Sequence, residues 1–339
     1  MVTAWQAETT DAESAAQLAR TLENIRFLDR VKFTPYVPSL YSSQPASFEE
    51  RLHRWLNNPG LSSEQQRDLF ELAYRIAFFS FDDFTAMFQN AFSGPISRWC
   101  MADAEIHLVQ PDWQDRLNEE RFEKTWFCPV TDSLLISVFH HVNGIERKDH
   151  KPAFRDLLHF GDDDKILEYI HEKDYKRIVL LEDFVGTGGQ SSATVEWVVR
   201  TLKIPVLFCP MIIATEGADK YRKLKANLDL ERDEDPTLPR FTFEPTLELD
   251  EDCFIQTPNT DPLSLSGRMK TLAADTHSRL GALQQQCGDG ELGFWKAGSK
   301  QKGATVVMFS NTPNNSLPLI HHSADQWSPL FPRVARQPL

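Results

Sequence analysis

The stretch LLEDFVGTGGQSS, residues 180–192, changes character twice. An apolar run leads into two adjacent acids, Glu182 and Asp183, and a glycine-rich loop with two serines follows. The apolar run predicts a buried strand, and SSATVEWVVRTLK (191–203) has the apolar spacing of a helix. The loop is therefore expected between the carboxyl end of a strand and the amino end of a helix. In open α/β sheets, ligands bind at that edge.

The loop has the composition of an anion-binding turn. Glycines let the backbone approach a ligand without Cβ clashes, and N–H groups at the start of a helix favour a phosphate. The hydroxyl and amide side chains between and after the glycines add further donors. The residues expected to bind a ligand here are Gly186, Thr187, Gly188, Gly189, Gln190, Ser191 and Ser192.

The two acids before the loop would repel a phosphate placed beside them. They suit a ligand that also carries a sugar, because carboxylates accept hydrogen bonds from vicinal hydroxyls. A Mg²⁺ ion that bridges sugar and diphosphate would have Asp183 as its protein ligand. We therefore expect a ribose 5-phosphate, with Glu182 and Asp183 as the catalytic pair at its hydroxyls and the glycines at its phosphate.

Strand-like and helical segments alternate from about residue 125 onward. This alternation predicts an α/β fold with a mainly parallel sheet flanked by helices. The acidic run 229–236 is expected to be a solvated loop. The expected strands are TWFCPV, KRIVLLEDF, PVLFCPMIIAT, RFTFEPTLEL and ATVVMFS, at 125–130, 176–184, 205–215, 240–249 and 304–310.

Residues 1–110 are expected to form an α-helical N-terminal region. The apolar spacing predicts helices over 11–30, 47–58 and 62–92, and Ser47 with Glu50 fits a capping box. The remainder, 111–339, is assigned to the α/β domain, including the segments NTPNNSLP and WSPLFPR near its end.

Charge and composition limit the range of functions. The net charge of −13 argues against broad binding to nucleic acid or to an anionic membrane. No apolar run approaches the roughly 18–20 residues that cross a bilayer, and the acidic start is unlike a secretory signal. The five cysteines are far apart and lack zinc-site spacing, which favours reduced thiols. We expect a cytoplasmic protein without a membrane partner.

The motif at 180–192 resembles the phosphoribosyl diphosphate (PRPP) loop of type I phosphoribosyltransferases. In that family the acidic pair contacts the ribose hydroxyls and the Thr-Gly segment binds the 5-phosphate. The tail GATVVMFSNTPNNSLPLIHHSADQWSPLFPR (303–333) looks like the C-terminus of a phosphoribosyltransferase-like family of bacterial conflict systems, including retron and other antiphage operons. Together with WFCPVTDS, the similarity spans roughly 120–335.

This resemblance implies PRPP or a nucleotide as the ligand, Mg²⁺ as the cofactor and an effector role in antiphage defence. A toxic activity would be restrained by partner proteins of the same operon. In a retron, these partners would be a reverse transcriptase and its non-coding RNA–DNA complex. A homo-oligomer is left open, as is the acceptor of a transferred ribosyl group.

The sequence also departs from the family pattern. Gly186 stands where many purine transferases have a third acid, and Gln190 replaces the usual final Thr. The best candidate for a diphosphate loop is at Val130, Thr131, Asp132 and Ser133, after the expected strand TWFCP. Asp132 or Ser133 could instead cap the next helix.

Two asparagines of the tail, Asn311 and Asn314, are further candidates for the site. Asparagine is common in turns, but the strand 304–310 would end at the ligand edge, where these side chains could contact a base or an acceptor. Lys151 and Arg155 are candidates for a lid over the site.

Other interpretations stay open. A nucleotide sensor or regulatory subunit without catalysis is favoured by the missing acid at Gly186. An S-adenosylmethionine-dependent methyltransferase would use the glycine-rich loop, with Glu216 on the ribose. A purely structural interpretation makes 182–192 a tight turn between a strand and a helix.

Overall fold

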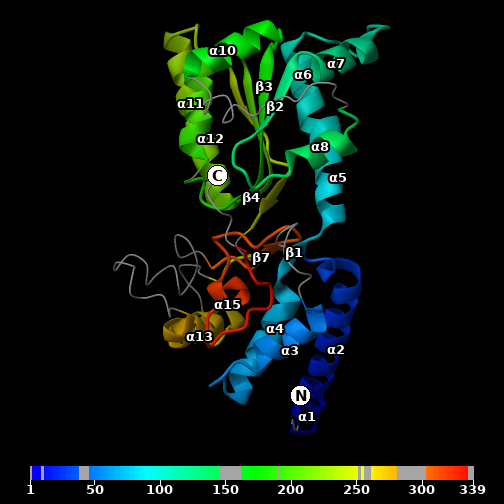
Figure 1. Ribbon diagram of the computed structural model, residues 1–339, viewed down its shortest axis with the longest axis vertical. Helices are drawn as coiled ribbons and strands as arrows, with labels where there is room; N and C mark the ends of the chain where they lie inside the picture. The colour runs from blue at the N-terminus through cyan, green and yellow to red at the C-terminus, as the bar shows by residue number, and fades with distance from the viewer. Residues whose placement is uncertain are drawn as a thin grey trace. The chain divides into compact units, whose positions relative to one another are not determined.

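A computed structural model describes residues 2–8, 11–37, 46–145, 162–189, 191–250, 253–255, 261–280 and 303–334. Its contacts divide the chain into two units (Figure 1). Unit 1 comprises Met1–Phe81 and Glu251–Leu339, and unit 2 is the continuous segment Asp82–Asp250. These bounds differ from the expected division at about 110, because the helices after Phe81 group with the sheet and the C-terminal segment groups with the N-terminal helices.

Unit 2 is built on a five-stranded sheet in which every pairing is parallel. The order is β2-β3-β4-β5, and β6 also pairs with β4. The expected α/β fold with a parallel sheet is confirmed. The strands are β2 (Thr125–Pro129), β3 (Arg177–Val185), β4 (Val206–Ala214), β5 (Phe241–Phe243) and β6 (Leu247–Leu249).

Helices cover both faces of this sheet (Figure 1). Alternate residues of β2 show the two layers, because successive side chains of a strand point to opposite faces. Trp126 stacks on Tyr175 at 5.9 Å, whereas Phe127 meets Phe139 of α8 at 5.4 Å. One layer consists of α10 (Asp163–Glu172), α11 (Ser192–Leu202) and α12 (Thr215–Glu234), and the other includes α5 (Phe81–Ala91), η2 (Phe92–Ile96) and α8 (Ile136–Val142).

Two further helices anchor the beginning of β3. They are α6 (Ser97–Asp103) and α7 (Trp113–Phe122). Arg177, the first residue of β3, is buried and donates to Asp103 at 2.8 Å and to Glu120. Because a buried guanidinium is stable only with partners, this ion-pair network fixes the amino end of the strand that carries the candidate site.

The central strand β4 contains a proline, Pro210, without losing its place in the sheet. The Pro210 carbonyl accepts a hydrogen bond from Thr246 N at 2.9 Å. In a strand, the N–H and C=O groups of one residue point toward the same neighbouring strand. The N–H that proline lacks would therefore also have faced the side of Thr246. The neighbouring strand is interrupted there, between β5 and β6, so the ladder from β4 to β3 stays intact up to Val185.

Unit 1 begins with helices whose start signals were visible in the sequence. Ser47 and Glu50 form the expected capping box, and Ser62 forms a second one with Gln65. Asp11 caps the long second helix. The elements are α1 (Val2–Glu8), α2 (Ala12–Leu28), η1 (Asp29–Phe33), α3 (Phe48–Leu56) and α4 (Ser63–Arg75).

Two expectations about secondary structure were wrong. The segment 62–92 is not helical throughout, because β1 (Ala77–Phe79) interrupts it and pairs in parallel with β7 (Val306–Met308). The acidic run 229–236 is not a loop, because α12 continues to Glu234. Pairs such as Arg200–Glu231, at 2.6 Å, and Lys225–Asp229 hold this helical end.

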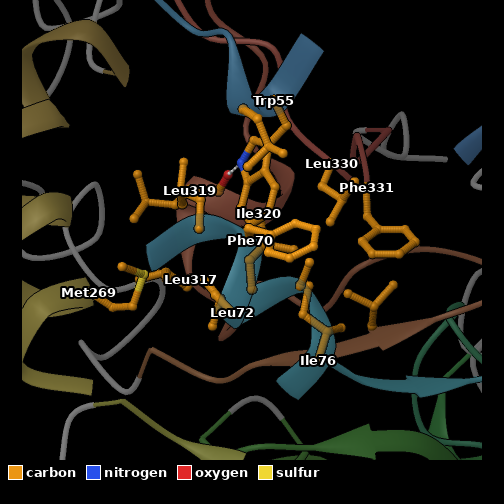
Figure 2. Close-up of a cluster of buried hydrophobic side chains, with 14 of the residues drawn as sticks. Trp55, Phe70, Leu72, Ile76, Met269, Leu317, Leu319, Ile320, Leu330 and Phe331 are labelled. Carbon is orange, nitrogen blue, oxygen red and sulfur yellow. Dashed lines mark hydrogen bonds between the residues drawn. The ribbon is translucent and has the colours of Figure 1, made fainter. Parts of the chain in front are cut away.

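The C-terminal segment is part of the core of unit 1 (Figure 2). Helices α13 (Leu265–Leu280) and α15 (Pro318–His321) belong to this unit. The indole N–H of Trp55 donates to Leu319 O at 2.7 Å, and that of Trp327 donates to the same oxygen at 3.0 Å. The α3 helix and the tail therefore share one buried cluster. None of the helices in the described parts of the chain is both long and apolar enough to span a membrane.

Arg51 of α3 ties the tail to the N-terminal helices. Its guanidinium is buried, donates to Leu330 O at 2.8 Å and to Ala46 O at 2.5 Å, and lies over the rings of Tyr36 and Phe331. The planar guanidinium can bond to both carbonyls and lie over the rings at the same time, whereas lysine carries a compact charge without this fork of donors.

Replacement of Arg51 is expected to destabilise unit 1. Arg51→Ala should lower the free energy of unfolding by about 3 kcal/mol, because a buried and a part-buried carbonyl lose their donor and the aromatic rings lose their packing. Arg51→Lys should recover little of this loss. Urea denaturation followed by tryptophan fluorescence measures both. The control is Arg54→Ala on the exposed face of the same helix, and equal effects of Arg51→Ala and Arg54→Ala would contradict the assignment.

Candidate functional site

The acidic pair lies where β3 extends beyond its neighbour. Strand β2 ends at Pro129, opposite Leu181, whereas β3 continues to Val185. Glu182 and Asp183 therefore have no strand beside them on the β2 side, and the loop that follows β2 occupies this place. Both acidic residues are only 4% exposed. Burial of two adjacent carboxyls is unfavourable unless donors compensate them.

The donors come from residues 130–133, here called the β2 loop. Thr131 donates its backbone N–H to Glu182 Oε2 at 2.9 Å and its hydroxyl to Glu182 Oε1 at 2.5 Å. The Ser133 hydroxyl lies 2.7 Å from Asp183 Oδ1 and 3.3 Å from Glu182 Oε1. The structure thus brings Thr131 and Ser133 to the acidic pair, whereas their proposed contact with a diphosphate stays a prediction. Asp132 lies between them and is exposed.

The capping alternative for this loop is wrong. Helix α8 begins at Ile136, its N-cap residue is Leu135, and no side chain caps it. The hydroxyl of Ser133 is used on the acids instead.

The hydroxyls of the β2 loop link the two carboxyls, and burial shifts the pKa of Glu182. Three short contacts run from Glu182 Oε1 through the hydroxyls of Thr131 and Ser133 to Asp183 Oδ1, at 2.5, 2.6 and 2.7 Å. The two hydroxyls thus lie between the carboxyls and link them. Burial and the neighbouring Asp183 raise the pKa of Glu182, although the donors from Thr131 and Ser133 oppose this shift.

The glycine loop, Gly186–Gly189, connects β3 to α11. Gly188 has φ of 69°, the left-handed region that favours glycine. Thr187 and Gly188 are buried, whereas Gly189 is exposed. The turn leads directly into helix α11, since Ser192 N donates to Gly188 O at 3.1 Å. Gln190 lies outside the described residues.

Helix α12 packs closely on this loop, which the sequence did not indicate. A Cβ atom on Gly217 would lie 2.4 Å from Gly186 O, so glycine is needed for the close approach. Tyr221 donates its hydroxyl to Ser191 Oγ at 2.6 Å, and the Lys220 ammonium donates to Gly188 O at 3.2 Å. The sequence offered one clue to these contacts. The residues follow β4, so they lie at the same edge of the sheet as the glycine loop.

The asparagines of the tail belong to unit 1. The strand expected at 304–310 is β7, which pairs with β1 in unit 1 and does not extend the five-stranded sheet. Asn311 is buried, donates to Val334 O at 3.0 Å and accepts from Thr312 N at 3.0 Å. Asn314 is half-buried. The Asn311 side chain thus bonds to backbone groups, as asparagine does in turns. Its contact with a ligand stays a prediction.

Carboxylate oxygens suit Mg²⁺, which binds proteins through one or two carboxylates together with substrate phosphates. Glu182 and Asp183 fit that role. Within the described ranges, no group of three or more His, Cys, Asp or Glu side chains is placed to hold a metal, so the ion would need oxygens from a ligand as well. Lys151 and Arg155, the lid candidates, lie outside the described residues.

The fold and the arrangement of the acids and glycines define a phosphoribosyltransferase-like α/β protein. The chain belongs to the PRTase-CE family, whose model matches residues 52–333. This range includes α4 and the C-terminal segment as well as the sheet, so much of unit 1 belongs to the family domain. No curated protein and no solved structure matches the chain significantly.

The close approach of α12 to the loop predicts an unusual response to alanine. In a helix, alanine is normally better than glycine by about 1 kcal/mol. Gly217→Ala should instead lower the free energy of unfolding by about 1–3 kcal/mol, because the clash is with the backbone of Gly186. The control is Gly94→Ala, where the nearest atom lies 3.6 Å from the new Cβ. Thermal unfolding measures both, and a stabilised Gly217→Ala variant would refute the close contact.

Proposed function

We propose that unit 2 binds a ribose 5-phosphate ligand, PRPP or a related nucleotide, together with Mg²⁺. The observation that carries this proposal is the continuous order of acids, glycine turn and helix at the carboxyl edge of a parallel sheet. Glu182 and Asp183 would accept the ribose hydroxyls, and the glycine loop would donate N–H groups to the 5-phosphate. Family membership supports this ligand class over S-adenosylmethionine.

The proposed reaction is transfer of a ribosyl-phosphate group or cleavage of a glycosidic bond. The transition state has oxocarbenium character, and negative charge on the acidic pair stabilises the positive charge that develops. Bound Mg²⁺ would supply charge neutralisation for a diphosphate leaving group. The β2 loop keeps the two carboxyls in fixed positions, since its hydroxyls bond to both of them.

A nucleotide sensor without turnover is the second candidate, and two observations favour it. Gly186 provides no side chain that could move a proton at the base or acceptor. Both acids are also almost fully buried and already accept hydrogen bonds from the protein. A ligand hydroxyl must add to these hydrogen bonds or displace them.

Isothermal titration calorimetry distinguishes these ligands. We expect PRPP with Mg²⁺ to bind the wild type, and Asp183→Asn to weaken binding at least tenfold, because an amide cannot replace the charge of a carboxylate toward the hydroxyls and the cation. S-adenosylmethionine and NAD⁺ should not bind. Glu172→Gln, an exposed carboxylate on α10, is the matched control.

The outcome of the titration decides between the candidates. Binding of S-adenosylmethionine alone would overturn the proposal in favour of a methyltransferase. Binding of PRPP without release of diphosphate in an enzymatic assay would favour the sensor.

We further propose that the protein acts in the bacterial cytoplasm as an effector of antiphage defence, under the control of operon partners. This proposal is supported by the resemblance of the C-terminal segment to a family of conflict systems. A retron reverse transcriptase with its RNA–DNA complex is the partner that the resemblance suggests.

Expression without such partners is expected to slow bacterial growth. The double variant Glu182→Ala/Asp183→Ala should restore growth, because the toxic chemistry would depend on the acidic pair. Growth curves at matched protein level measure this, with Glu172→Gln as the control. Toxicity that persists in the double variant would show that another part of the chain is responsible.

A further inference from the structure

Helix α12 determines the direction of backbone groups in the glycine loop. The Lys220 ammonium donates to Gly188 O at 3.2 Å, and the stem of the same side chain packs on Gly188. The ring of Tyr221 also packs here, 3.2 Å from the position that a Cβ on Gly188 would take. The Gly188 carbonyl therefore faces α12.

In a trans peptide the C=O and N–H groups point in opposite directions. The peptide between Gly188 and Gly189 is trans. Because its carbonyl is held toward α12, the N–H of Gly189 points away from that helix. The Gly186 carbonyl also lies against α12, beside Gly217, so the N–H of Thr187 points away as well. Two N–H groups on one side of a turn form a concave donor site for an anion.

We propose that Lys220 is a positioning residue of this anion site. This inference rests on the proposed function and adds a residue to it. Together with the Ser192 N–H, which donates to the same oxygen at 3.1 Å, Lys220 holds the Gly188–Gly189 peptide so that the Gly189 N–H is directed at the phosphate of the ligand. Its charge also polarises the peptide, because a cationic donor on the carbonyl makes the opposite N–H a stronger donor. Lys220 acts through the backbone and does not itself need to touch the ligand.

The sequence allows this single peptide to be observed directly. The chain has 15 glycines, and Gly188–Gly189 is its one Gly-Gly pair. Glycine labelled with ¹³C at the carbonyl and ¹⁵N at the amide therefore creates one doubly labelled peptide bond in the full-length protein. A carbonyl-filtered NMR spectrum then reports the Gly188 carbonyl and the Gly189 N–H alone.

The variants are Lys220→Ala, Lys220→Arg and, as the matched control, Lys223→Ala on the exposed face of the same helix. In the free protein, Lys220→Ala should shift the Gly188 carbonyl signal upfield, because the carbonyl loses a charged donor. Lys220→Arg should retain the wild-type position, and Lys223→Ala should not change it.

Ribose 5-phosphate is the probe for the anion, and ribose is its phosphate-free control. In the wild type, ribose 5-phosphate should move the Gly189 amide proton downfield, whereas ribose should not. Lys220→Ala should weaken the affinity for ribose 5-phosphate about tenfold, Lys220→Arg less than threefold and Lys223→Ala not at all.

Two results would overturn the inference, and they differ. A Gly188 carbonyl signal that is unchanged in Lys220→Ala would show that Lys220 does not orient the peptide, whatever the ligand. A signal that shifts in Lys220→Ala, but an amide that does not respond to ribose 5-phosphate in the wild type, would refute the proposed function and with it the role of Lys220.

Discussion

The hydrogen bonds from Thr131 and Ser133 to Glu182 and Asp183 tie the end of β3 to the loop after β2. They are required because β3 places two adjacent carboxyls in a buried position, where a carboxylate without donors is strongly destabilising. The parallel ladder to β4 holds the other side of the same strand. The acids are therefore fixed from both neighbours, and the glycine loop that follows them starts from a rigid point.

The break beside Pro210 shows how the sheet protects this arrangement. A proline in a central strand removes one ladder hydrogen bond, and here the loss is on the side of β5 and β6. The same strand β4 leads into α12, whose first turns contact the glycine loop. A single strand thus supports the acids through its ladder and the glycine loop through the helix that follows it.

Much of unit 2 could be predicted from the sequence, because local patterns determine it. Apolar runs and apolar spacing predicted β2, β3, β4 and α11, and the order of acids and glycines predicted the candidate site. The contacts of Lys220 and Tyr221 could not be predicted, because they depend on how α12 packs on a loop that is distant in sequence. Likewise, β1 becomes a strand only through its pairing with β7, whereas its own sequence continues a helical pattern.

The division of the chain has a consequence for synthesis on the ribosome. Unit 2 is one continuous segment, so all of its strands leave the ribosome before the C-terminal part does. Unit 1 needs both ends of the chain, since β1 pairs with β7 and Trp55 bonds to Leu319. During translation the sheet can form first, as nascent chains fold from the N-terminus in units. The helices of unit 1 must wait with an exposed apolar surface until the last part of the chain emerges, which makes them a natural substrate for chaperones.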